Sequence, residues 1–224
     1  LAFLDSDDCW LPEKLELQVK LHQADPGKLV SQTQEIWFRN GVRVNPRIRH
    51  SQPDGEAFFA SLELCVVSAS SVILSRQVWE KIGGFDEKMA VCEDYDMWLR
   101  VAAHQQIHLL KHELVKKFAG AADQLSKIEP AMDRYRAYAL LKLLISEKLD
   151  SAQQLATIDV VLKKLRILAN GAKKRNLVQA KVYQSIVDRI EQGSFCDYDL
   201  SLLEKELKQP AAIFSEIAPF ASPA

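Results

Sequence analysis

This sequence lacks three features that would point to particular classes of protein. No apolar run approaches the ~18–20 residues of a membrane-spanning helix. The four cysteines form no CxxC pair, so neither a zinc site nor a disulfide framework is indicated. A basic excess is missing too, because 29 Lys and Arg face 30 Asp and Glu, for a net charge of −1. We therefore expect a cytoplasmic protein with no transmembrane segment and no nucleic-acid partner.

The sequence also begins without a methionine. Residues 1–4 are apolar and run directly into the acidic residues 5–8. This pattern is typical of the second half of a buried strand. A buried strand needs neighbours on both sides, so we expect the chain to be the C-terminal portion of a longer protein.

The first half of the chain has the pattern of an α/β domain, which we place at residues 1–122. Short apolar runs alternate there with turn signals. Strands are expected over residues 30–38, 65–74 and 107–118. Asn40-Gly41 predicts a hairpin after the first of them.

Helices are expected before and between these strands. The first follows the acidic residues and places Leu15 and Val19 on an apolar face toward the core. Ser75 is expected to cap a short helix that Gly83 ends. A further helix is expected to begin at Glu93.

Beyond residue 122 the pattern is helical. We expect a helical appendage over residues 123–208 and a flexible tail over residues 209–224. A basic cluster within residues 163–175 is expected to be a solvated face, with a weak contact to anionic lipid as the alternative. The helix that carries residues 163–166 of this basic cluster is expected to end at Gly171. Two capping boxes are predicted, Ser151 with Gln154 and Ser201 with Glu204.

The acidic residues 5–8 are the first concentration of chemistry. Asp5, Asp7 and Asp8 repel one another unless a cation lies among them, and a hard divalent ion such as Mg²⁺ or Mn²⁺ suits carboxylate ligands. We place them where a buried strand ends, which is where open α/β sheets bind ligands. One alternative is a solvated acidic turn. Another is an aspartate-dependent phosphohydrolase, in which Asp5 would form an aspartyl-phosphate.

A second concentration lies at the start of the helix near residue 93. Helical spacing puts Asp94, Trp98 and Val101 on one face. A plain N-cap is the alternative reading of Asp94. Asp96 and Arg100 are spaced for an ordinary i,i+4 ion pair.

Both concentrations resemble family 2 glycosyltransferases with the GT-A fold. FLDSDDCWLPEKL (residues 3–15) resembles the LDxDDxWxPxKL segment of that family. VWEKIGGFDE (residues 78–87) and EDYDMWLR (residues 93–100) resemble its acceptor-side block. The resemblance covers roughly residues 1–126. It implies an α/β chain, a partial GT-A fold that lacks the N-terminal nucleotide-binding βαβ unit, followed by an α-helical region.

The resemblance also implies residue roles. Asp7, with Asp5, would bind a divalent metal ion (Mn²⁺ or Mg²⁺) at the diphosphate of a nucleotide-sugar donor. Asp94 would be the general base that deprotonates a hydroxyl acceptor. Some relatives carry a His as a further ligand in a "GGHxDQLS"-like run, where this chain has Ala121. The remaining expected substrate contacts are Asp5, Asp8, Glu93, Trp98 and Asp86.

The implied function is the transfer of a sugar with inversion, in the synthesis of a cell-surface polysaccharide or lipopolysaccharide. The acceptor would be a saccharide or lipid-linked hydroxyl, and a peripheral contact with the inner membrane face is compatible with that. The isolated chain is expected to be inactive, because the missing unit would hold the donor. A non-catalytic helical interaction module is the alternative from another class.

Overall fold

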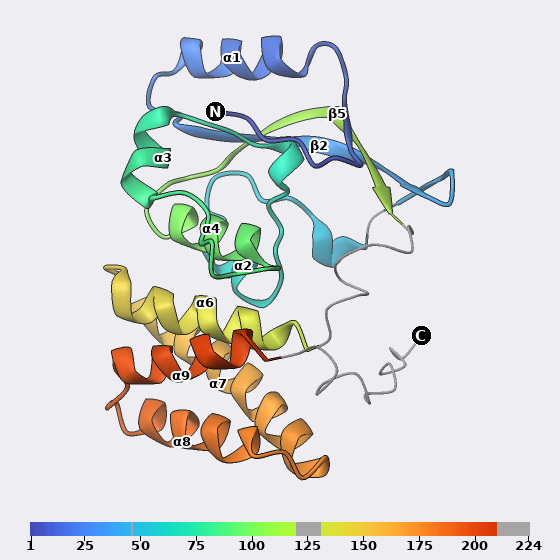
Figure 1. The fold of residues 1–224 in the computed structure, drawn as a ribbon. Coiled ribbons are helices and arrows are strands. Elements are labelled where there is room, and N and C mark those ends of the chain that lie inside the picture. Colours follow the sequence, from blue (N-terminus) through green and yellow to red (C-terminus); the bar gives the residue numbers. More distant parts are fainter. Residues whose placement is uncertain (46, 120–130, 210–224) are drawn as a thin grey trace.

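The computed structural model describes residues 1–45, 47–119 and 131–209. Within them an α/β part lies against a part made of helices alone (Figure 1). This confirms the predicted fold class, whereas the predicted boundary at residue 122 lies outside the described residues. The sheet of the α/β part runs in the order β1 (Cys9–Trp10), β5 (His108–Ala119), β2 (Val30–Arg39) and β3 (Val42–Val44), with β4 (Ile73–Leu74) paired to β2.

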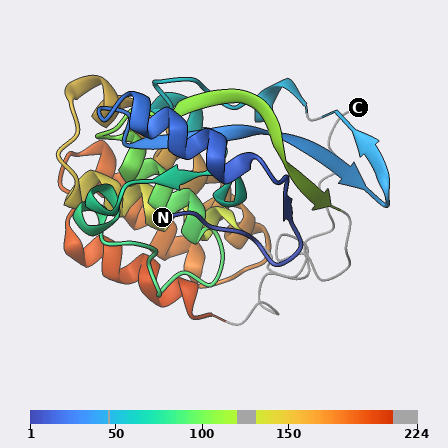
Figure 2. The ribbon, with the colours of Figure 1, turned by 90° about the horizontal axis from the view of Figure 1, so that it is seen from above.

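The two long strands β2 and β5 form the centre of this sheet. They run parallel, and the other pairs are antiparallel. Their register slips between Thr33 and Glu35, where β5 has extra residues that bulge opposite β2. Helix α1 (Lys14–Ala24) covers one side of the sheet, while α2 (Phe58–Glu63) and α4 (Glu93–Ala102) lie on the other (Figures 1 and 2).

Several local predictions are confirmed. Asn40 and Gly41 adopt the positive φ angles of 50° and 78° that a tight hairpin between β2 and β3 requires. The Ser75 side chain accepts a hydrogen bond from the Val78 backbone N–H and so caps α3 (Arg76–Ile82). Gly83 ends that helix in the left-handed region.

The expected buried strand at the start of the chain is wrong for the described structure. Residues 1–5 form one bridge, between Ala2 and Ile73. Leu1 and Leu4 are 44% and 47% exposed, and Phe3 alone of the apolar residues packs against the core. The acidic residues therefore lie before the short strand β1 and not at the end of a buried strand.

The expected apolar face of α1 is also wrong. Leu15 and Val19 are 45% and 44% exposed, whereas Lys14 and Gln18 are fully buried. The reason is a polar anchor, because Gln18 Nε2 donates to the backbone oxygens of Ser31 and Ser71. These hydrogen bonds fix which side of the helix faces the sheet.

Of the strand expected over residues 65–74, only β4 (Ile73–Leu74) forms. Residues Ala69–Ser71 form a 3₁₀ turn instead, and Ser71 Oγ donates to the backbone oxygen of Ser68. Serine side chains that bond to nearby backbone compete with the ladder of a sheet, which explains why the apolar run does not continue as a strand.

The helices of the second part pack on the first through one continuous core. Buried residues of that core include Trp98 and Met97 from α4 together with Leu140, Val161 and Ile186. Figure 1 shows α6 directly beneath α4 and α2. The second part consists of α6 (Asp133–Ser146), α7 (Ser151–Lys174), α8 (Gln179–Glu191) and α9 (Asp197–Leu207).

Four details of these helices correct the sequence predictions. The α7 box uses Asp150 with Gln153, one residue before the predicted pair. The α9 box uses Cys196 with Asp199, so Ser201 and Glu204 lie inside the helix. Helix α7 also continues through Gly171, and its basic residue Lys164 is buried beside Asp133 and not solvated.

Candidate functional site

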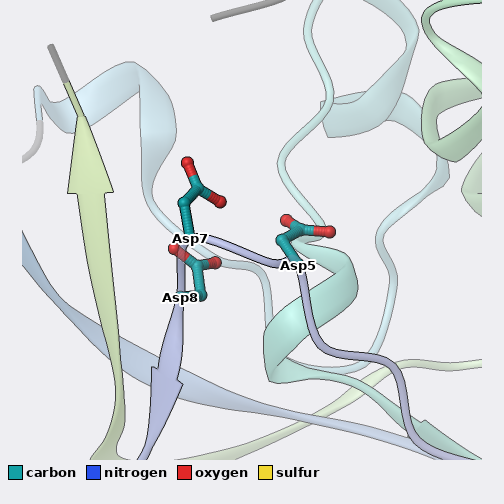
Figure 3. Close-up of side chains that lie close together, drawn as sticks. All are labelled: Asp5, Asp7 and Asp8. Carbon is teal, nitrogen blue, oxygen red and sulfur yellow. The ribbon is translucent and has the colours of Figure 1, made fainter. Parts of the chain in front are cut away.

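The three aspartates of the acidic loop, residues 5–8, converge in space (Figure 3). One carboxylate oxygen from each lies within 4.8 Å of the others. One contact within the loop and one to a distant segment hold it: the Asp8 N–H donates to the Asp5 backbone oxygen at 3.1 Å, and the Asp5 N–H donates to Ser70 Oγ at 3.1 Å. Asp5 and Asp7 are exposed, whereas Asp8 is buried.

Strand β5 brings a lysine to this loop. Lys117 Nζ lies 3.2 Å from Asp8 Oδ2 and 3.6 Å from Asp5 Oδ2. The Phe118 backbone N–H donates to Asp8 Oδ1 at 3.3 Å. Burial lowers the pKa of Lys117, but the neighbouring charges of Glu35, Asp8 and Asp5 outweigh it and raise that pKa above the ordinary value.

The exposed part of the loop fits a hard divalent ion. Mg²⁺ and Mn²⁺ take oxygen ligands, and Mg²⁺ is usually held by one or two carboxylates together with water and substrate phosphate. Asp5 and Asp7 offer such oxygens at the surface. The Asp8 carboxylate is already bonded to β5, so it is the least suited of the three.

Asp94 lies in the first turn of α4, after Cys92 in the left-handed conformation. Asp94 Oδ1 accepts from the Tyr95 N–H at 2.6 Å, and the Cys65 thiol lies 3.6 Å from Oδ2. Burial raises the pKa of Asp94, although the Tyr95 and Cys65 hydrogen bonds oppose part of that effect. A carboxylate with a raised pKa is a stronger base, as a proton acceptor requires.

A cavity of about 120 Å³ joins the two predicted concentrations of chemistry. Asp5 and Asp94 both line it, although 89 residues separate them in the chain. The rest of the wall comes mainly from β2, from β5 and from the segment that leads into the 3₁₀ turn Ala69–Ser71. Its lining is Asp5, Glu35, Trp37, His50, Gln52, Cys65, Val66, Val67, Ser68, Ala69, Asp94 and Lys117.

The other expected substrate contacts do not line this cavity. Trp98 is fully buried in an aromatic cluster with Phe3 and Phe85. Asp86 instead pairs with Lys142 of α6, at 2.7 Å between Oδ2 and Nζ. Glu93 stands beside Asp94 half-buried, and burial raises its pKa. In the described structure Trp98 thus packs in the core, and Asp86 contributes to the contact between the two parts.

Sequence reasoning missed several polar and aromatic residues of the cavity wall. Glu35 and Trp37 alternate along β2, so both side chains project from one face of the sheet, and Trp37 Nε1 donates to Glu35 Oε2 at 2.9 Å. A charged residue within a predicted strand was the available signal for Glu35 and Lys117. His50 and Gln52 lie two residues apart after β3, whereas Lys117 belongs to β5, so only the fold brings them together.

Two further points concern the chain as a whole. No helix among the described residues is long and apolar enough to cross a lipid bilayer. Ala121, which stands where some family 2 enzymes have His, lies outside the described residues.

The chain is similar to two curated proteins. It is 22% identical over 215 residues to an uncharacterized glycosyltransferase of Rickettsia typhi, covering 88% of this chain and 63% of that protein. It is 25% identical over 205 residues to an uncharacterized glycosyltransferase of Rickettsia prowazekii, covering 83% of this chain and 61% of that protein. The chain thus spans less than two thirds of the length of these relatives.

Comparison with solved structures gives a more distant likeness. The structure of residues 1–349 of TarS from S. aureus aligns with a TM-score of 0.45 at 13% identity, over 92% of this chain and 65% of that one. No protein-family model matches the chain.

Proposed function

We propose that this chain carries the reaction centre of a glycosyltransferase. The proposed reaction moves a sugar from a nucleotide-sugar donor to a hydroxyl acceptor with inversion, as in family 2 enzymes of the GT-A fold. The observation that carries the proposal is the shared cavity, in which a carboxylate of the acidic loop, Asp5, faces the same space as Asp94. The two curated relatives, both named glycosyltransferase, support the same class of reaction.

Asp94 is the proposed general base. The acceptor oxygen attacks the anomeric carbon while its proton passes to the Asp94 carboxylate and the bond from that carbon to the diphosphate oxygen breaks. Attack from the side opposite the leaving group inverts the anomeric configuration. The partly buried position of Asp94 supports this role, because burial raises its pKa and therefore its basicity.

Asp5 and Asp7 are the proposed holders of a divalent metal ion. When bound, such an ion would neutralise the charge that builds on the departing diphosphate. Asp5 is exposed in the loop and also lines the cavity, which supports a role for it beside both the ion and the acceptor. The proposal includes a cytoplasmic location and a role in the synthesis of a surface polysaccharide or lipopolysaccharide.

Calorimetric titration of the chain with Mn²⁺ tests the metal part of this proposal. We expect Asp7→Ala to abolish binding and Asp94→Asn to preserve it, because Asp94 is a base and not a ligand. Asp159→Ala is the matched control, since Asp159 is an exposed carboxylate of α7 far from the loop in the sequence. Absence of Mn²⁺ binding in the wild type, or equal losses in Asp7→Ala and Asp159→Ala, would contradict it.

Turnover of nucleotide sugars, measured on the protein as its gene encodes it, tests the base. Removing a general base costs about 10²–10⁴-fold in rate, so we expect Asp94→Asn to fall by at least about 100-fold. Release of inorganic phosphate from a simple phosphoester, lost in Asp5→Asn, would instead support a phosphohydrolase.

A further inference from the structure

We propose that Lys117 is the internal cation of the acidic loop, a positioning residue that holds Asp8 and competes with a divalent ion for Asp5. The inference rests on the proposed function only in its reference to that ion. The sequence indicated that three carboxylates so close together need a positive charge among them. The structure brings that charge from β5, across a separation of 109 residues.

The contacts divide the three aspartates between two tasks. Asp8 has a side chain only 1% exposed, and it bonds both Lys117 Nζ and the Phe118 N–H. Asp5 is 49% exposed in its side chain and lies farther from Lys117, at 3.6 Å. Asp7 makes no ion pair with the residues that the structure describes. Asp8 therefore pairs with Lys117, and Asp7 is available to solvent or to an added ion. Asp5 can contact either the lysine or the ion.

Lys117 itself is fixed from several sides. Its Nζ donates to Ser68 Oγ at 3.0 Å as well as to Asp8, and Glu35 contributes a further negative charge across the cavity. One ammonium thus faces the carboxylates of Asp5, Asp8 and Glu35, and its charge also acts on Asp94. This surplus of negative charge attracts a further cation to the loop. The Lys117 ammonium, however, already occupies one side of the site that such a cation would take.

Two cations that share a carboxylate oppose each other. Removal of the Lys117 charge therefore strengthens the binding of a divalent ion. A bound ion in turn restores part of the stability that the protein loses with the lysine. At the effective dielectric constant of about 20 that suits a protein site, a charge a few ångströms away changes affinity by about tenfold or more. A lysine with a purely structural role would give the opposite result, since a disordered loop binds ions less well.

The experiment compares Lys117→Met with Lys117→Arg in the full chain, using Mn²⁺ alone as the probe. We expect Lys117→Met to lower the melting temperature without metal, to bind Mn²⁺ about tenfold more tightly, and to gain more in melting temperature from Mn²⁺ than the wild type. Lys117→Arg keeps the charge and is expected to retain the Mn²⁺ affinity of the wild type. Lys111→Met is the control, because Lys111 lies on the same strand with an exposed side chain.

A second measurement keeps the proposal testable if Lys117→Met is poorly folded. Asp8→Asn removes the charge that Lys117 neutralises. The double variant Lys117→Met/Asp8→Asn is therefore expected to have a melting temperature equal to or above that of Lys117→Met alone. Additive losses in the double variant, or unchanged or weaker Mn²⁺ binding in a folded Lys117→Met, would overturn the proposal. If the wild type and Lys117→Met both fail to bind Mn²⁺, the metal part of the proposed function is wrong, and the stability comparison alone decides the role of Lys117.

Discussion

At the scale of single residues, the protein buries several charged groups. The free energy that each burial costs depends on the partners of the charge. Lys117 is partly buried and surrounded by carboxylates, whereas Lys14 is fully buried and has no hydrogen-bond partner for its Nζ among the described residues. Lys14 Nζ instead lies 4.5 Å from the centre of the Trp10 ring. Burial lowers the pKa of Lys14 to about 8, so this lysine is buried at a net cost.

We expect Lys14→Met to stabilise the protein at pH 7. The folded pKa of about 8 lies below the unfolded value of 10.5, so the penalty is fully present below pH 8 and disappears as the pH rises toward 10.5. The shift corresponds to about 2–3 kcal/mol at pH 7, after allowance for the lost cation–π contact. Urea unfolding at pH 7 and pH 10 measures this, with a smaller gain expected at pH 10.

Lys20→Met is the control for that prediction. Lys20 lies on the same helix with an exposed side chain that pairs with Glu16. Exposed pairs contribute little, so we expect a change within about 0.5–1 kcal/mol at either pH. A loss of stability in Lys14→Met at pH 7 would show that the stacking on Trp10 outweighs the burial of the charge.

At the scale of elements, helix ends are set by side chains that bond to the first free N–H groups. Asp150 accepts from the Gln153 N–H at 2.8 Å, and Gln153 Oε1 accepts in return from the Asp150 N–H at 3.1 Å. The sequence offered Ser151 and Gln154 one position later, with the same chemical pattern. Two overlapping boxes of equal quality cannot be distinguished by the sequence pattern alone, and the structure uses Asp150 with Gln153.

We expect Asp150→Ala to cost about 1 kcal/mol of the free energy of unfolding, because the α7 terminus loses its cap. Ser151→Ala is the matched control and is expected to change stability by a few tenths of a kcal/mol, since Ser151 is the first exposed residue inside the helix. Chemical denaturation of both variants checks the order. A larger loss in Ser151→Ala than in Asp150→Ala would contradict the observed box.

At the scale of the whole molecule, the α/β part and the helices are joined by charge as well as by the shared core. Lys142 Nζ of α6 lies 2.7 Å from Asp86 Oδ2 and 2.7 Å from Asp96 Oδ1. Asp96 also pairs with Arg100, at 2.7 Å, within α4. The cluster therefore connects α6 to the turn after α3 and to α4, which carries Asp94.

We expect the protein to unfold in one transition, because its core is continuous across both parts. Lys142→Met leaves Asp86 and the buried Asp96 without one partner each, which costs about 3 kcal/mol for a buried pair. Differential scanning calorimetry should show the single transition move to lower temperature without splitting. Two separate transitions in the wild type would contradict the single cooperative unit.

Lys163→Met provides the matched control for Lys142→Met. Lys163 of α7 pairs with Glu63 of α2 at 2.6 Å, so it also joins the two parts, but both side chains are more than half exposed. Such a pair contributes about 0–1 kcal/mol. The comparison separates the effect of burial from that of simply crossing between the parts.

The sequence by itself determined the features that depend on a few neighbouring residues. The Asn40-Gly41 hairpin, the Ser75 cap with Gly83 at the other end, and the start of α4 at Glu93 all follow from backbone preferences that act over one turn. The acidic loop and the Asp94 turn were identified for the same reason, since their residues are adjacent in the chain. These signals are local, and the tertiary structure changed only the setting of the acidic loop, which lies before β1 and not at the end of a buried strand.

Only the tertiary structure decided which of these features lie close together in space and which charged residues lie beside them. The contact between Asp8 and Lys117 spans 109 residues, and no local pattern encodes the partner of a buried carboxylate. The same holds for the buried side of α1, where hydrogen bonds to Gln18 prevail over the apolar pattern, and for Asp86, which pairs with a lysine of the helical part. Burial makes an unpaired charge or polar group costly, so such partners are selected by the complete fold and not by the segment that carries them.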